Sequence, residues 1–279
     1  MVASIRQLPF IYTIAAFVMV LIMSCAVFAP LIAPYEPNQV LPDETLQPCS
    51  AAHLLGTDAL GRDVFSRILY GARVSVGFAV AAALCTMLLG VTLGLIGGYF
   101  GGTADTSIQL VVSVFQGLPG MSLMIAIAGI LGPGTASLLL AVTLTSWPGF
   151  SRIVRGEVLK IREENYIEGV RSMGGSDWYT ILHYIIPNIL SSLIVLFTLR
   201  IGTVVLSVAS LSFLGLGMQP PQADWGVMIN DAKIYFRSYP NLLWAPALCM
   251  LALCASINLI GDALRDLFSI RKDIHKQFL

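Results

Sequence analysis

The residues able to do chemistry are sparse in this chain, and their spacing does not form an enzyme's active site. His53, His183 and His275 lie far apart, and no Cys-x-x-Cys or His-x-x-His spacing suggests a metal site. The five cysteines are equally scattered, so no disulfide framework is expected. The G-x-x-x-x-G-K-[ST] phosphate loop and the H-E-x-x-H and G-x-S-x-G motifs are all missing from the sequence. The sequence therefore predicts neither covalent catalysis nor ATP binding by that route.

One segment, residues 151–187, stands out because it is a long charged stretch between apolar ones. It is expected to form two helices separated by a turn at Gly174-Gly175, with Ser176 or Asp177 capping the second. An apolar stripe at helical spacing follows the turn: Trp178, Ile181, Leu182 and Ile185. A short amphipathic helix of this kind suits docking into a groove on a soluble partner. The alternative is that the stripe lies on the chain's own helices or in the lipid interface.

The elements that must position this segment are recognised by where charges are absent. Lys, Arg, Asp and Glu do not occur in residues 7–35, 74–104, 106–151 and 238–261, and Arg200 alone interrupts a fifth apolar stretch. About 20 apolar residues cross a hydrocarbon layer as a helix. The stretch 106–151 is long enough for two crossings, so six spans are predicted. Mean hydropathy of +0.80 and a net charge of zero agree with a membrane protein that does not bind nucleic acid. The predicted fold class is an all-α, polytopic membrane helical bundle.

Three further residues allow two interpretations each. Arg200 lies near the middle of a predicted span, where it could line a path and bind a substrate carboxylate, or reach the membrane surface from a tilted helix. Asp224 and Trp225 lie in an outer loop, where they could gate the path or contact a partner, or only stabilise the loop.

The segment 151–187 also resembles a known family signature. Glu168-Gly169-Val170, Gly174 and Tyr184-Ile185-Ile186-Pro187 have the spacing of EAA-x3-G-x9-I-x-L-P, which marks the membrane subunits of ABC importers. Gly169 and Val170 stand where alanines are usual, and Tyr184 stands where Ile is usual. Four more segments are similar to permeases for dipeptides, oligopeptides and nickel, in the expected order along the chain: 53–67, 212–217, 224–226 and 261–266.

This resemblance implies a "C"-type permease with the type I importer fold and a division of the chain into membrane and aqueous parts. Ten Lys and Arg on one side against five on the other predict that both termini are cytoplasmic. The resemblance implies that the membrane is a bacterial inner membrane. The aqueous parts are the cytoplasmic N-terminus 1–9, the periplasmic loops 34–73 and 213–239, the cytoplasmic coupling loop 151–187 and the cytoplasmic C-terminus 265–279. The first span is 10–33, and the core 74–264 holds the spans 74–97, 107–130, 135–151, 188–212 and 240–262.

The resemblance also implies partners and roles. The partners would be two ATPase subunits that bind ATP and Mg, a second and distinct permease, and a periplasmic binding protein, so this chain would hold no cofactor and would not be an enzyme. The residues implied in coupling to the ATPase are Glu168, Gly169, Val170, Gly174, Ser176, Asp177 and Pro187. The expected substrates are short peptides. Nickel or a metal–chelator complex is the alternative, and an ion-coupled secondary transporter is a distant one.

Overall fold

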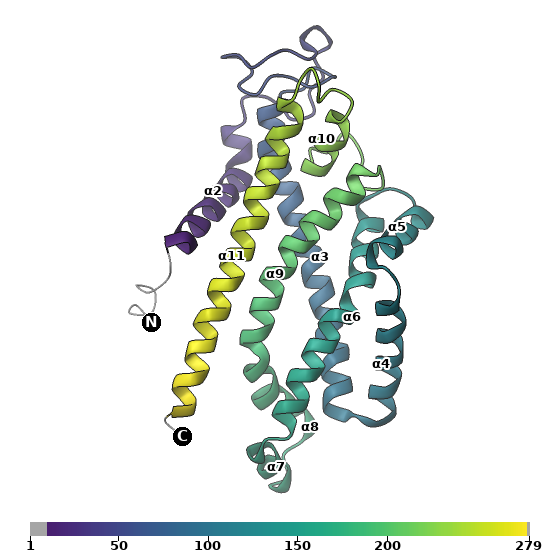
Figure 1. Ribbon diagram of the computed structural model, residues 1–279, viewed down its shortest axis with the longest axis vertical. Helices are drawn as coiled ribbons and strands as arrows, with labels where there is room; N and C mark the ends of the chain where they lie inside the picture. The colour runs from purple at the N-terminus through teal and green to yellow at the C-terminus, as the bar shows by residue number, and fades with distance from the viewer. Residues whose placement is uncertain (1–9, 278–279) are drawn as a thin grey trace.

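The chain forms an elongated bundle of helices (Figure 1). The computed structural model describes the backbone of residues 10–277 and the side chains of residues 10–268, so the predicted N-terminus 1–9 lies outside the described residues. The helices in chain order are α2 (Phe10–Ile32), η1 (Pro42–Glu44), α3 (Val64–Phe100), α4 (Gly102–Gly117), α5 (Gly120–Leu131), α6 (Thr135–Arg162), α7 (Asn165–Ser172), α8 (Asp177–Thr180), the π-helical turn η2 (Ile181–Ile185), α9 (Ile186–Phe213), α10 (Trp225–Ala232) and α11 (Asn241–Gln277).

Four of the described helices are long and apolar enough to cross a membrane. They are Phe10–Ile32, Val64–Phe100, Asp177–Phe213 and Asn241–Phe268, and a fifth crossing is possible if α4 and α5 count as one bent span. The helix α6 does not join them, because its apolar part ends at Ser151 and charged residues follow from Arg152. The described residues thus form an all-helical membrane protein with four or five candidate spans.

The predicted span 107–130 is not one helix. It is broken between Gly117 and Gly120, and the axes of α4 and α5 differ by 92°. Pro119 explains the break, since it lacks a backbone N–H and forces the preceding Leu118 into an extended conformation with φ −94° and ψ 141°. Gly132-Pro133-Gly134 separate the next two helices, because α5 ends at Leu131 and α6 begins at Thr135.

The helices α3 and α6 approach each other closely along a line of glycines. A Cβ atom on Gly90 would lie 2.5 Å from the Cβ of Phe150, and one on Gly98 would lie 2.9 Å from the Cβ of Val158. Gly94, between them, faces Ser151 and Val154 in the same way. The GxxxG spacing therefore serves backbone approach in this bundle, as small residues do between membrane helices.

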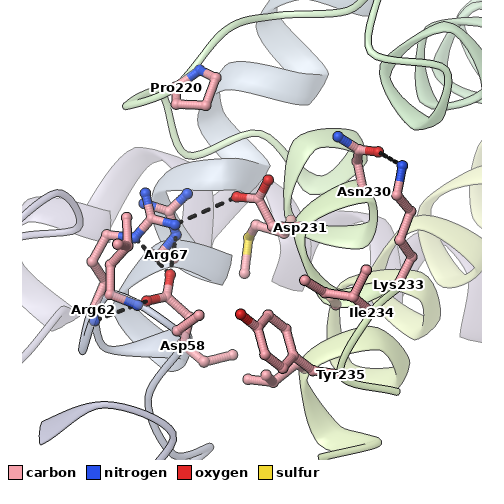
Figure 2. Close-up of a pocket in the computed structure, with 15 residues that line it drawn as sticks. Asp58, Arg62, Arg67, Pro220, Asn230, Asp231, Lys233, Ile234 and Tyr235 are labelled. Atoms are coloured by element: carbon pink, nitrogen blue, oxygen red, sulfur yellow. Dashed lines mark hydrogen bonds and ion pairs between the residues drawn. The ribbon is translucent and has the colours of Figure 1, made fainter. Parts of the chain in front are cut away.

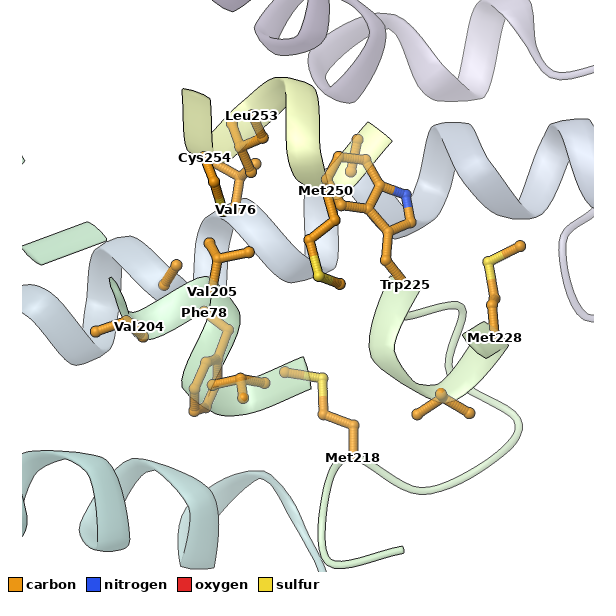
Figure 3. Close-up of a cluster of buried hydrophobic side chains, with 14 of the residues drawn as sticks. Val76, Phe78, Val204, Val205, Met218, Trp225, Met228, Met250, Leu253 and Cys254 are labelled. Carbon is orange, nitrogen blue, oxygen red and sulfur yellow. The ribbon is translucent and has the colours of Figure 1, made fainter. Parts of the chain in front are cut away.

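The bundle has different structures at its two ends (Figure 1). Residues 33–63, here named the cap, lie over one end together with α10, and α7 and α8 lie at the other. Trp225 of α10 is buried with Met250 and Leu253 of α11 and with Val76 of α3 in the core near the cap (Figure 3). A second buried cluster near α7 contains Tyr99, Phe150 and Ile185. The two ends are thus held by separate apolar clusters.

His53 organises the cap. Its ring is 2% exposed, its Nδ1 lies 2.9 Å from Oδ1 of Asp63, and its Nε2 lies 3.0 Å from Oε2 of Glu44. Tyr35 stacks on the ring with a centroid distance of 4.8 Å. Burial by itself lowers the pKa of His53, but the hydrogen bonds to the two carboxylates outweigh it, and the pKa is raised above 6.5. Asp63 also caps α3 by accepting from the backbone N–H of Ser66 at 2.7 Å, so the helix begins at Val64, ten residues before the predicted span.

Candidate functional site

The short helix α7 is the exposed element of the predicted coupling loop. Its sequence alternates polar and apolar residues so that Ile167 and Val170 are buried, while Glu168 is exposed and Gly169 is half-buried. One face of α7 is therefore fixed against the chain, and the face with Glu168 is free for contact with another molecule.

A double-glycine turn ends α7. Gly174 has φ +85°, a left-handed conformation that glycine adopts without the steric cost paid by other residues. The backbone N–H groups of Gly174 and Gly175 donate to the carbonyls of Arg171 and Val170, at 3.0 and 2.9 Å. A Cβ on Gly175 would lie 2.6 Å from Cγ1 of Val170. Both glycines are thus required by geometry, although only Gly174 is expected from the signature spacing.

Tyr99, at the end of α3, joins the bundle to this loop. Its hydroxyl donates to Oδ1 of Asp177 at 2.7 Å, and the guanidinium of Arg171 lies 4.9 Å from the centre of its ring. Arg162 donates to the backbone carbonyl of Tyr99 at 2.9 Å. Tyr99 is 3% exposed. Sequence reasoning missed Tyr99, Arg171 and Arg162, because the partners are far apart along the chain and no local pattern signals them.

A second link, also missed, ties α4 to α6. Arg155 donates through Nε and Nη2 to the two carboxylate oxygens of Asp105, at 2.5 and 2.6 Å. This two-pronged geometry is the strongest arrangement available to an arginine and a carboxylate. The sequence does contain a signal for this ion pair. Asp105 is the one charge between two long uncharged stretches, and a charge in that position needs a partner.

The apolar stripe after the turn does not form a separate docking helix. Ile181 and Ile185 are buried in the bundle, whereas Trp178 and Leu182 are 71% and 54% exposed. Ser176 caps α8 by accepting from the N–H of Tyr179, and the chain then stays helical from Asp177 to Phe213. The sequence predicts a single apolar face for these four residues. Because the helix continues into the bundle, one side of it is buried against other helices and the opposite side stays exposed.

Pro187 lies in the first turn of α9, directly after the π-helical turn η2. Because proline has no N–H to donate to residue 183, the regular hydrogen-bond ladder cannot run through this point. Pro187 is exposed, as are Ser176 and Asp177. The predicted coupling residues therefore lie along one continuous path from α7 through the turn to the start of α9.

Arg200 connects two helices. It donates to the hydroxyl of Ser146 on α6 and, at 3.3 Å, to Oγ1 of Thr203 on its own helix α9. Its buried Nε has no hydrogen-bond partner among the described residues. The side chain thus lies between α6 and α9, and its head is directed at a helix.

Asp224 and Trp225 are buried and used within the fold. The carboxylate of Asp224 accepts from Ser75 Oγ at 2.6 Å and from the N–H of Gly226 at 3.0 Å. The indole of Trp225 donates to the carbonyl of Ile68 at 3.0 Å, and its ring lies against Gly71. Both residues are 1% exposed and join α10 to α3, which favours the loop-stabilising interpretation. Burial of the Asp224 carboxyl raises its pKa.

Comparison with known proteins gives a consistent result. Residues 90–272 match the family described as the binding-protein-dependent transport system inner membrane component. The glutathione transport system permease protein GsiD of Pectobacterium atrosepticum is 41% identical over 253 residues, which cover 90% of this chain and 84% of that protein. The GsiD protein of Escherichia coli O6:K15:H31 is 42% identical with the same coverage. A chain of the MetNI methionine ABC transporter, solved in inward-facing conformations, superposes with a TM-score of 0.57 at 17% identity and covers 72% of this chain and 96% of that one. The last likeness concerns the fold alone.

Proposed function

This chain belongs to the binding-protein-dependent transport system inner membrane component family, and from that premise we propose that it imports short peptides. As a family member it is a multi-pass inner-membrane permease of an ABC importer, in the branch that handles peptides and nickel. It is a transport subunit and not an enzyme, and it holds no cofactor of its own. Membership also implies ATPase and binding-protein partners.

The similarity to GsiD is the observation that supports a peptide as the substrate. The relatives at 41% and 42% identity are named as glutathione permeases, and glutathione is a tripeptide. Similarity of this extent covers nine-tenths of the chain, so it includes the outer loops and the helices that surround a path. A short peptide with free carboxylates is the substrate class that this similarity favours.

The α7 end is where we place the contact with the ATPases. Glu168, Met173 and Trp178 are exposed there, and Met173 and Trp178 are 83% and 71% exposed. A large aromatic side chain that is left in solvent beside a charge is typical of a surface that another protein covers. Two ATPase subunits, one for this chain and one for a second, distinct permease, complete the assembly that we propose.

The topology follows from this placement. The α7 end faces the cytoplasm, the cap faces the periplasm, and both termini are cytoplasmic. Six crossings result if α6 crosses and the bent pair α4–α5 counts as one. The substrate path through these helices alternates between inward-open and outward-open states, as in transporters with a central site.

Uptake by the purified assembly tests the proposal. The chain is tagged, extracted gently with its partners, and reconstituted in vesicles with the binding protein that co-purifies. We expect ATP-dependent uptake of labelled glutathione or dipeptides, and little uptake of nickel. Partners identified by mass spectrometry should include ATPases and a second permease. Uptake of a metal–chelator complex without peptide uptake would overturn the peptide assignment, and uptake that needs an ion gradient in place of ATP would overturn the coupling role.

A further inference from the structure

A cavity of about 400 Å³ lies between the cap and α10 (Figure 2). Its lining is mainly apolar, with Leu60, Met228 and Leu242 among its residues, and a few charged groups converge on one side. A largely apolar cavity of this size with a few directed polar groups is the usual form of a small-molecule site. It is formed partly by the segment 53–67, which the family resemblance singles out and which the coupling function leaves unused.

Two buried arginines form the charged side of this cavity. Arg67 is 1% exposed and Arg62 is 5% exposed. Arg62 is held firmly by Asp58, with 2.6 Å between Nε and Oδ2. Arg67 donates from Nη1 to the carbonyl of Pro37 at 3.0 Å, but its buried Nη2 has no hydrogen-bond partner among the described residues. A buried guanidinium with an unused donor is costly and calls for an acceptor.

Asp231 of α10 contacts Arg62, one of these two arginines, only loosely. Its Oδ2 lies 3.4 Å from Nη2 of Arg62, and its side chain is 39% exposed. Figure 2 shows Asp231 beside the arginines, with Tyr235 pointing its hydroxyl into the cavity. Asp231 thus stands where a better-placed carboxylate could take over the contact with Arg62.

The charges beside the arginines favour exchange of one carboxylate for another. At the arginines the charges balance, with Arg62 and Arg67 against Asp58 and Asp231, while Lys233 is bonded to Asn230 and lies apart (Figure 2). An arriving carboxylate therefore has to take the place of Asp231 beside the arginines. Arginine recognises planar carboxylates through paired hydrogen bonds, which distinguishes them from spherical anions.

We propose that this cavity binds the carboxylate of a short peptide on the outer side of the permease, with Arg62 and Arg67 as donors and Asp231 as the group that is displaced. The site rests on the proposed function for its orientation and for the choice of a peptide. It lies within this one chain, and it is separate from the coupling surface at α7.

Equilibrium binding to the purified transporter without its binding protein tests the site. The probe is glutathione, and the comparison compound is glutathione with both carboxylates converted to amides. We expect glutathione to bind with at least tenfold higher affinity than the amide, since charge-assisted hydrogen bonds are lost with the charge. The measurement needs neither ATP nor transport, so its failure would leave the proposed function untouched.

Two variants are expected to change the affinity for glutathione in opposite directions. Asp231→Asn removes the competing carboxylate and should tighten glutathione binding severalfold, whereas Arg67→Gln should weaken it at least tenfold. Arg237→Gln, at an exposed arginine outside the cavity lining, is the matched control and should bind as the unmodified protein does. If Arg67→Gln fails to fold, the test rests on whether Asp231→Asn binds glutathione more tightly. Asp231 is partly exposed and contacts Arg62 only loosely, so this variant is expected to fold.

A second titration uses the ligand-free binding protein in place of glutathione. If glutathione does not bind up to about 10 mM, but the affinity of the binding protein rises in Asp231→Asn and falls in Arg67→Gln, the cavity binds an acidic side chain of the binding protein. The inference that the cavity binds a peptide substrate is then wrong. If neither ligand responds to these two variants, the site itself is overturned.

Discussion

Single residues in the predicted coupling loop are fixed by backbone geometry more than by side-chain chemistry. Gly174 has φ +85° with open space around its Cα, whereas Gly175 has Val170 within 2.6 Å of a Cβ position. Gly169 has open space, lies inside α7 and does not have a positive φ. The three glycines therefore differ in what they require, although they lie within seven residues of one another.

Replacing Gly174 by Ala should impair coupling. The left-handed conformation costs a non-glycine residue about 1–2 kcal/mol, so the turn will shift to relieve it and the angle of α7 will change. We expect transport per ATP hydrolysed to fall, measured in reconstituted vesicles. Gly169→Ala is the control, because alanine favours the helix by up to about 1 kcal/mol and meets no neighbour there. Equal losses in both variants would contradict this role for Gly174.

The stability of the cap should depend on pH through His53. Its pKa is raised in the folded protein by Asp63 and Glu44 despite burial. The stabilisation is therefore fully present below the unfolded pKa of about 6.5 and is lost as the pH rises through the folded pKa. Hydrogen exchange of residues 33–63 should slow as the pH is lowered toward 6.5, after correction for intrinsic rates. His53→Gln should remove this dependence, and an unchanged profile in that variant would exclude His53 as its source.

Among the elements, α3 reaches from the cap to the predicted coupling loop. It begins at the Asp63 cap beside His53 and ends at Tyr99, which contacts Asp177 and Arg171. Its glycine line against α6 keeps the two helices in close contact over the intervening length. We therefore expect a movement of α7 and α8 to be passed to α3 directly, through the ring contact with Arg171 and the hydrogen bond to Asp177.

Removing the Tyr99 hydroxyl should weaken this transmission. Tyr99→Phe keeps the ring, and so keeps the packing and the Arg171 contact, but loses the bond to Asp177. We expect basal ATP hydrolysis to stay near normal, and its stimulation by the loaded binding protein to fall severalfold. Asp177→Ala is the partner change, and the double variant should be no worse than either single one, because both remove the same interaction. Additive losses would show that the two residues act separately.

At the scale of the whole molecule, the two proposed functional surfaces lie at opposite ends of the bundle (Figure 1). The cap and α10 enclose the arginine cavity, while α7 and the double-glycine turn form the other end. Separate apolar clusters support them. This separation is what a permease requires if one end receives substrate and the other contacts the ATPases.

Thiol labelling tests the orientation of the protein in the membrane. Cys49 is exposed in the cap, so a membrane-impermeant maleimide should label it in spheroplasts. Met173→Cys, in a Cys49→Ser background, should react only after the membrane is opened, because Met173 is 83% exposed at the α7 end. Labelling of both sites from the outside would contradict the proposed topology.

Much about this protein was determined by its sequence alone. Uncharged runs long enough to cross lipid predict a helical membrane protein, because an unpaired charge or backbone group is costly in hydrocarbon. The spacing from Glu168 to Pro187 indicated the family, which the comparisons confirm, and it also indicated the loop for coupling. These are local features, and local chemistry is sufficient to recognise them.

The tertiary structure decided which distant residues meet. Tyr99 and Asp177 are 78 residues apart in the chain, and Arg62 and Asp231 are 169 apart. No periodicity predicts such pairs, since they depend on how helices cross and on which face each one buries. The same reason explains why the stripe from Trp178 to Ile185 divides between bundle and solvent, and why Asp224 and Trp225 are buried: packing against other elements, which a linear pattern cannot express, sets the exposure of each side chain.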